Sequence, residues 1–314
     1  MKQTDSINNP HQDGHGHKHQ HGSHRHVPVG LSGKKIFWVT VLNLTITVTE
    51  LVGGLLSGSL SLLSDSLHNL SDSVAVAMSY AANLVARRPK NARQTFGYKR
   101  AEILAAFVNS AALLAISAFL IIEAIRRWQK PETINGTLMI IVAAIGLAAN
   151  LLSVFLLEKE SHINLNIKSS YLHLLSDTIS SVGVIVGGIA IKLWGLVWID
   201  PLITILISLY ILRETWHILR KTINILMQAS ARLDYPRIKQ DIESIEHVCN
   251  IHHIHSWMMN DNTIHFEAHL DLEDMPLSQI EPIYEQVEQI LIQHGISHII
   301  LQPEVDKCQN KNMF

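Results

Sequence analysis

A histidine and an aspartate four residues apart occur twice in this chain, each time inside a long apolar segment. The first pair is His68 and Asp72, and the second is His173 and Asp177. Because residues i and i+4 lie on one face of a helix, each segment would present an imidazole and a carboxylate to the same side. Two such helices packed face to face would gather two nitrogen and two oxygen donors. Zinc is bound tetrahedrally by such donors at about 2.0 to 2.2 Å, so the pattern predicts a Zn²⁺ site.

The same four residues admit a second interpretation, because polar side chains inside membrane helices often serve only as hydrogen-bonding contacts between helices. An ionisable group in the hydrocarbon costs roughly 2.5 to 3.5 kcal/mol on insertion scales, and such groups usually mark ion or substrate paths. Here four of them recur with identical spacing. The sequence therefore favours a metal path through a membrane over four separate structural roles.

Composition places the chain among membrane proteins. It has 314 residues, of which 47% are hydrophobic and 17% are charged, whereas an average soluble protein is about 25% charged. The formal net charge of −2 argues against a nucleic-acid partner, for which a basic domain is expected. The two cysteines, Cys249 and Cys308, make no disulfide framework and fit a reducing cytoplasm.

Apolar stretches of the length that a helix needs to cross a bilayer, about twenty residues, follow one another from Lys34 onward. We therefore predict an all-α membrane bundle of six transmembrane helices over residues 34–227, in contact with membrane lipid. The six stretches lie at 35–56, 60–85, 102–126, 136–158, 168–193 and 199–226.

Lysines and arginines near the helix ends predict the orientation of this bundle, since cytoplasmic loops carry an excess of them. Twelve lie on the side that holds both chain termini, against four on the other side. We expect a multi-pass protein of the cell membrane, plasma or inner, with both termini in the cytoplasm. The twelve are Lys34, Lys35, Arg87, Arg88, Lys90, Arg93, Lys99, Arg100, Lys159, Lys168, Arg220 and Lys221, and the four are Arg126, Arg127, Lys130 and Lys192.

Residues 1–33 form a histidine-rich tail that we expect to be disordered and cytoplasmic, because its tract from His11 to His26 has no apolar residues with which to build a core. It lacks the apolar region of a signal peptide. Its composition suggests loose capture of metal ions, in which we place His15, His17, His19 and His21, and a merely solubilising tail is the alternative.

Residues 228–314 are more polar and predict a small cytoplasmic α+β domain. Helix, strand, strand, helix and strand follow in that order, which packs as helices on one face of a sheet. The strand over 263–272 alternates, so that Phe266, Ala268 and Leu270 point to one face. The expected elements lie at 236–247, 252–259, 263–272, 278–294 and 297–302.

The opposite face of that strand carries His265, Glu267 and His269. Together with His252 or His255 from the preceding strand, they predict a second metal site outside the membrane. Solvated surface histidines are the alternative interpretation, because such patterns are not specific.

Two further acids lie in the apolar stretches and are candidates inside the bundle. Glu50 can charge, so we expect it to line a water-filled cavity that leads to the four-residue site. Asp65 lies three residues before His68 and would either orient its imidazole, as ligating histidines usually require, or lie near the far headgroups.

The arrangement resembles the cation diffusion facilitator family, and in particular its bacterial zinc/cadmium/cobalt efflux members. The likeness rests on Gly58-Ser59-Leu60 before the first pair, on Phe96-Gly97-Tyr98-Lys99-Arg100-Ala101-Glu102 before the third helix, and on the second pair. It spans about residues 34 to 305.

The resemblance implies a homodimer of six-helix protomers that exports Zn²⁺ from the cytoplasm in exchange for protons, with Cd²⁺ and Co²⁺ as further substrates. It implies a ferredoxin-like cytoplasmic domain that dimerises and responds to zinc, and no organic cofactor. His252 and His269 match family ligands there. Two further ligand positions hold Glu281 and Leu301 in this chain, so we expect a rearranged site with Glu304 as the substitute.

Two other function classes are alternatives to transport. An intramembrane metalloenzyme is not expected, because the H-E-x-x-H pattern is missing from the sequence. A membrane-anchored metal sensor or store, using the tail and the C-terminal domain, is the alternative to a transporter. Imidazole ligands suit Zn²⁺ better than Mg²⁺, which agrees with either class.

Overall fold

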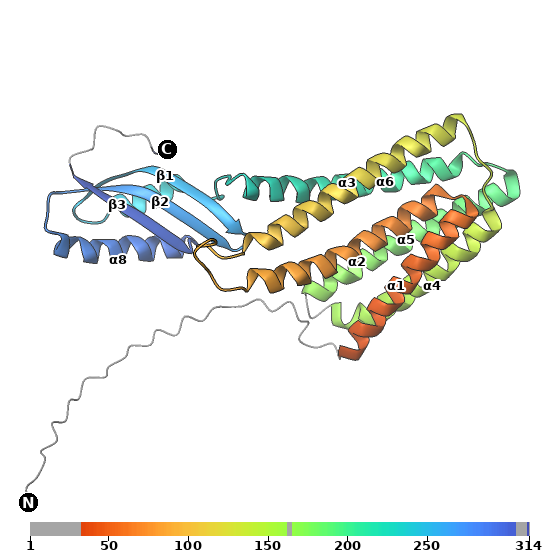
Figure 1. Cartoon of the computed structure of the whole chain (residues 1–314), viewed down its shortest axis with the longest axis horizontal. Helices are drawn as coiled ribbons and strands as arrows, with labels where there is room; N and C mark the ends of the chain where they lie inside the picture. Colours follow the sequence, from red (N-terminus) through yellow and green to blue (C-terminus); the bar gives the residue numbers. More distant parts are fainter. Residues whose placement is uncertain (1–32, 162–164, 306–312, 314) are drawn as a thin grey trace, which may run out of the picture.

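The computed structural model describes residues 33–161, 165–305 and 313. Within these ranges six long helices precede a three-stranded sheet with two shorter helices, and Figure 1 shows the two parts end to end. The predicted fold class, a helical membrane bundle with a small α+β domain, is therefore confirmed. The long helices are α1 Gly33–Ser57, α2 Leu60–Ala86, α3 Arg100–Gln129, α4 Gly136–Ser161, α5 Leu165–Trp194 and α6 Ile199–Leu226.

Among the described residues, four of these helices are long and apolar enough to cross a membrane: α3, α4, α5 and α6. Val41–Ser57 of α1 is a further apolar helix. Helix α2 is long enough, but it carries serines, an asparagine, two aspartates and a histidine along its middle. Of the helices predicted to cross the membrane, α2, which bears the first histidine-aspartate pair, is therefore the least apolar.

Helix α2 has a central place in the bundle, since it contacts α1, α3, α5 and α6. Helices α4 and α5 pack closely together, as do α3 and α6, and the second pair lies on one side of the other four helices (Figure 1). Leu62 of α2, Met139 of α4 and Val184 of α5 are almost fully buried in one cluster. This packing brings the polar middle of α2 against α5.

A buried carboxylate fixes the start of α2. Asp200, near the beginning of α6, is fully buried, and its two oxygens accept four hydrogen bonds from the first residues of α2. The side chain of Ser59 also accepts from the amide of Leu62, which caps the helix. The four donors to Asp200 are Ser59 Oγ at 2.6 Å, Leu60 N at 2.8 Å, Ser61 N at 3.2 Å and Ser61 Oγ at 2.6 Å.

The turn before α2 is held from the outside as well. Gly58 has a φ of +73°, a conformation that glycine adopts without strain. Its carbonyl accepts a hydrogen bond from Arg127 Nη1 of α3 at 2.6 Å. Hydrogen bonds therefore join the α1–α2 turn to both α3 and α6. They fix the position of α2 along the axis of the bundle.

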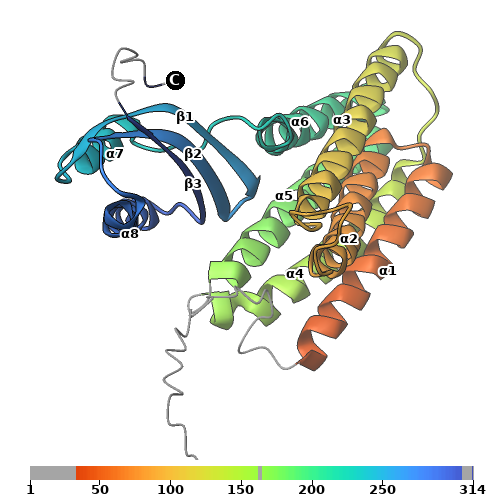
Figure 2. The same ribbon diagram turned by 60° about the vertical axis from the view of Figure 1, so that its left-hand side comes forward.

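The C-terminal part contains α7 Tyr235–Glu243, β1 Val248–Asn260, β2 Thr263–Leu272, α8 Leu277–Gln293 and β3 His298–Val305. The sheet order is β1-β2-β3, antiparallel between the first two strands and parallel between the last two. Figure 2 shows α7 and α8 on the same side of the sheet.

The core of this part lies between the sheet and its helices, as the alternation predicted. Phe266 and Leu270 of β2 are fully buried against Ile242 of α7 and Val287 of α8. A register shift between His252 and His255 interrupts the β1–β2 ladder. Such a bulge re-aims the side chains of the bulged strand.

We predict that Asp200→Asn lowers the stability of the protein by about 1 to 3 kcal/mol, because an amide nitrogen would face a buried donor where a carboxylate oxygen accepted it. Thermal unfolding of the purified chain in detergent measures the effect. The same substitution at Asp261, an exposed residue paired with Lys221, is the control and leaves the midpoint nearly unchanged. Equal midpoints for both variants would contradict a positioning role for Asp200.

Candidate metal centre

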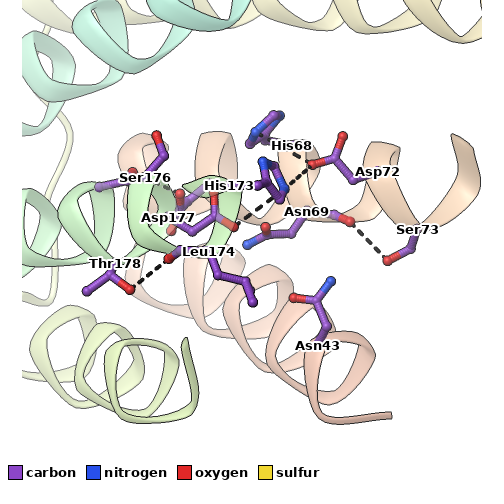
Figure 3. Close-up of polar contacts among 12 residues, drawn as sticks. Asn43, His68, Asn69, Asp72, Ser73, His173, Leu174, Ser176, Asp177 and Thr178 are labelled. Carbon is purple, nitrogen blue, oxygen red and sulfur yellow. Dashed lines mark hydrogen bonds and ion pairs between the residues drawn. The ribbon is translucent and has the colours of Figure 1, made fainter. Parts of the chain in front are cut away.

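The two histidine-aspartate pairs meet between α2 and α5 (Figure 3). His173 Nε2 of α5 lies 2.9 Å from Asp72 Oδ2 of α2. Within α2, His68 Nε2 lies 3.6 Å from the same oxygen, and within α5, His173 Nε2 lies 3.6 Å from Asp177 Oδ2. The i, i+4 spacing thus places each pair on one helix face, and the packing of α2 on α5 turns these two faces toward each other.

The donor atoms are close enough to share one ion. Ligand atoms of His68, Asp72 and His173 all lie within 4.8 Å of one another. The two imidazole rings have their centroids 5.6 Å apart and are tilted by 68°, so neither ring stacks over the other. Asp177 is not one of these three, but its Oδ2 lies 3.6 Å from His173 Nε2, so it is a candidate fourth donor.

Exposure differs across the cluster. The side chain of His173 is 42% exposed, whereas that of Asp177 is 6% exposed. One side of the cluster is therefore open, and the other is closed by the bundle. An ion can approach past His173 and Asp72 while Asp177 holds it from the inner side.

The charge of the cluster suits a dication. Two carboxylates contribute two negative charges, and within the described ranges neither forms an ion pair with a lysine or an arginine. Buried charges are stable when they are paired or coordinate a metal. A divalent cation is the partner that balances both carboxylates at once.

Asp65 is 3% exposed and is packed among the helices of the bundle. Its Oδ1 accepts a hydrogen bond from Ser180 of α5 at 2.9 Å. Nδ1 of His68 is buried and has no hydrogen-bond partner among the described residues. Asp65 therefore fastens α2 to α5 one turn from the candidate ligands, a role that its own sequence position did not predict.

Glu50 of α1 is 1% exposed, and its Oε2 accepts a hydrogen bond from Asn69 Nδ2 at 3.3 Å. Glu50 is thus packed inside the bundle, and the water-filled cavity predicted from the sequence is not what surrounds it. Gly146 of α4 leaves the space that it needs, since a Cβ there would lie 2.1 Å from Glu50 Oε1. Because Asn69 follows His68 directly, this contact supports the helical turn that carries the ligand.

A second group of possible ligands lies on the sheet, at the ends of β2 and β3. His269 Nδ1 is 3.0 Å from Glu304 Oε1, and His252 Nε2 is 3.4 Å from Glu304 Oε2. His252 and Glu304 are buried, and His269 is partly buried. Three donors from three strands therefore converge, and they are the three that the sequence placed together.

The remaining histidines of that face lie elsewhere. His255 Nε2 is 3.3 Å from His253 Nε2, at the bulge of β1. His265 stacks on Trp257 and contacts His298, well along the strand from His269. The rings of His252 and His253 both lie beside that of His269, with centroids 5.5 Å and 4.6 Å away. The histidines of the tail, His15, His17, His19 and His21, lie outside the described residues.

Comparisons with known proteins agree on one family. The sequence pattern of the cation efflux transmembrane domain matches residues 36–227, and that of the cation efflux protein cytoplasmic domain matches residues 231–305. A Bacillus subtilis protein named a cadmium, cobalt and zinc/H(+)-K(+) antiporter is 35% identical over 302 residues, which cover 95% of this chain and 94% of the relative.

Two further relatives carry transport names. The zinc transporter ZitB of Escherichia coli is 35% identical over 296 residues, covering 93% of each chain. The metal cation efflux system protein CzcD of Cupriavidus metallidurans is 33% identical over 297 residues, covering 94% of this chain and 91% of the relative. The likeness therefore extends through both parts of the structure.

We predict that Gly146→Ala destabilises the protein by about 1 to 3 kcal/mol, because the added methyl group forces Glu50 off Asn69 in a tightly packed core. The matched control is Gly183→Ala on α5, where the methyl group meets no atom within 4 Å. That variant should be unchanged or slightly more stable, since alanine favours helix. Thermal unfolding in detergent compares the two, and a Gly146→Ala midpoint at or above that of Gly183→Ala refutes the packing argument.

Proposed function

The chain belongs to the cation diffusion facilitator family of cation efflux proteins, and on this premise we propose that it exports Zn²⁺ in exchange for protons through the site between α2 and α5. Divalent metal efflux is the activity that the names of its relatives state. The antiporter named for cadmium, cobalt and zinc supports Cd²⁺ and Co²⁺ as further substrates. A sensor or store is not favoured, because the relatives match along nearly the whole chain and bear transport names.

One observation carries the proposal. Ligand atoms of His68, Asp72 and His173, which come from two different helices, lie within 4.8 Å of one another, and Asp177 Oδ2 lies 3.6 Å from His173 Nε2. A four-ligand tetrahedral set with no open position is a binding site, whereas a catalytic zinc keeps a position for water. This donor set therefore supports carriage of the ion.

Proton coupling follows from competition for lone pairs. A nitrogen that donates its proton to a carboxylate cannot offer a lone pair to a metal at the same time, so His173 holds either a proton facing Asp72 or an ion. Imidazole is the side chain whose charge changes most readily near neutral pH, which suits such an exchange. We propose that Zn²⁺ displaces protons on the cytoplasmic side and that protons displace Zn²⁺ outside.

Release requires movement between the two helices. Each helix supplies only two donors, so a shift of α5 relative to α2 separates the donor pairs and lowers the affinity for the ion. Transporters commonly achieve alternating access by rocking one group of helices against another around a central site.

The positive-inside pattern supports a cytoplasmic location for both termini and for the C-terminal domain. The match to the dimerisation-type cytoplasmic domain supports a homodimer. We place a regulatory Zn²⁺ at His252, His269 and Glu304, where burial and convergence favour an ion over separate surface roles.

We predict that His68→Ala, Asp72→Asn, His173→Ala and Asp177→Asn each reduce zinc flux by about a hundredfold or more, since even outer partners of metal ligands are worth about 10- to 100-fold in affinity. Flux is measured in inverted membrane vesicles with an acidic lumen. His217→Ala and Asp261→Asn, exposed residues of the same types, serve as controls and keep full flux.

Collapse of the pH gradient with a proton carrier separates the two parts of this proposal. Flux should fall to the rate that the zinc gradient alone supports. Zinc flux that does not depend on the pH gradient, together with ligand variants that do not transport, would refute antiport but would still support the transport site. Ligand variants that transport normally would refute the site itself.

We predict that zinc slows hydrogen exchange of the β2 and β3 backbone and that Glu304→Gln abolishes this protection, because the amide removes the charge that the two histidines face. Exchange is followed by mass spectrometry on the full chain with and without Zn²⁺. Glu267→Gln, a substitution of the same kind on β2, is the matched control. Equal protection in both variants would rule out a Glu304-dependent site.

A further inference from the structure

The segment that joins α2 to α3 is strongly basic. Between the end of α2 and the first residue of α3 it carries six arginines and lysines, and the next acidic residue along the chain is Glu102. A cluster of this kind at one end of a membrane bundle creates a local positive potential that attracts anionic groups. The six are Arg87, Arg88, Lys90, Arg93, Lys99 and Arg100.

The described part of the chain provides no carboxylate for these cations. None of the six is in an ion pair with a described residue. Glu102, the nearest acid in sequence, accepts a hydrogen bond from Asn83 of α2 at 2.7 Å. Asp261 on the β1–β2 turn is paired with Lys221 at 3.0 Å. The positive charge of the segment is therefore uncompensated within the described residues.

A cavity of about 470 Å³ opens where this segment meets the sheet. Its wall combines Arg100 with the aromatic side chains of Phe96, Tyr98 and Trp257, and Gln228 lines it from the link after α6. Phe96 also packs edge-on against His265, with the ring centroids 5.5 Å apart. Figure 1 shows the α2–α3 segment reaching the end of the sheet, so the cavity lies at the junction of the two parts.

Arg100 is the charged group of this cavity. Its Nε is buried from solvent and has no hydrogen-bond partner among the described residues. It is also the first residue of α3, where free amide groups and the helix dipole favour an anion. A buried guanidinium nitrogen without a partner is costly, so an acceptor in the cavity would stabilise this arrangement.

The positive potential also acts on a neighbouring side chain. Burial, together with the charges of His298, Lys99, Lys90 and Arg100, lowers the pKa of His265 to about 4. His265 is therefore neutral at physiological pH and does not compete with Arg100 for an anion.

We propose that this cavity binds the phosphate headgroup of an anionic phospholipid, with Arg100 as its main ligand. Guanidinium and phosphate form paired, charge-assisted hydrogen bonds. A lipid source is favoured over free phosphate because the wall continues along Leu104 of α3, which is 53% exposed on a membrane helix and offers a surface for an acyl chain. The bound lipid joins α3 and the sheet and so links the bundle to the C-terminal domain.

The test uses the full chain in a neutral detergent and counts bound lipid by native mass spectrometry. Phosphatidylglycerol should bind saturably and more tightly than phosphatidylcholine. Arg100→Gln should weaken phosphatidylglycerol binding about tenfold, as expected for the loss of one charge-assisted contact. Arg93→Gln, an exposed arginine of the same segment, should leave the affinity unchanged.

A second variant guards against misfolding at Arg100. Gln228→Glu keeps the size of the side chain and places a carboxylate in the cavity, so it should weaken phosphatidylglycerol binding without lowering the thermal midpoint. Equal binding of the two lipids, or Arg100→Gln binding like the wild type, overturns the proposal. Displacement of phosphatidylglycerol by inorganic phosphate at matching concentrations would identify free phosphate as the ligand and overturn the lipid assignment.

Discussion

Two carboxylates held inside a membrane bundle are the constraint on which this structure depends. Asp72 and Asp177 cannot stay charged in a low-dielectric setting without a partner, and the described residues near them offer histidines instead of lysines or arginines. A fixed cation would neutralise the site permanently and exclude a metal. Imidazoles can be protonated or can bind an ion, so the balance of charge is left to exchangeable partners. The transport chemistry follows from this choice of residues.

Contacts with the other helices fix the position of α2 along the axis of the bundle. Asp200 receives the first residues of α2, Asp65 bonds to Ser180 of α5, and Asn69 bonds to Glu50 of α1. Each of these contacts joins α2 to a different helix, and together they restrict its sliding and rotation. A ligand set needs geometry within a fraction of an ångström, and side chains locked by a second set of hydrogen bonds provide it.

The sequence predicted the candidate ligands but not the hydrogen bonds that hold their helices in place. His68, Asp72, His173 and Asp177 were found because helical spacing is a local property, and Phe266 and Leu270 were placed in the core by strand alternation. The contacts of Asp65 and Asp200 join residues more than a hundred positions apart, with separations of 115 and 141 for Ser180 and Ser59, and no local pattern encodes them. Glu50 was misjudged for the same reason, since the glycine that makes room for it lies on another helix.

The packing of the helices suggests where the movement can occur. Helix α5 packs mainly along α4, and α2 packs mainly along α1 and α3, whereas the direct contact between α2 and α5 is smaller and includes the hydrogen bond from Ser180 to Asp65. A core of interlocked apolar side chains resists sliding, because every shift opens voids. A small polar contact can exchange hydrogen-bond partners with less loss. The candidate ligand cluster therefore spans the smaller contact between α2 and α5 and not the tightly packed helix pairs, so an ion bound there would add a link between these two helices.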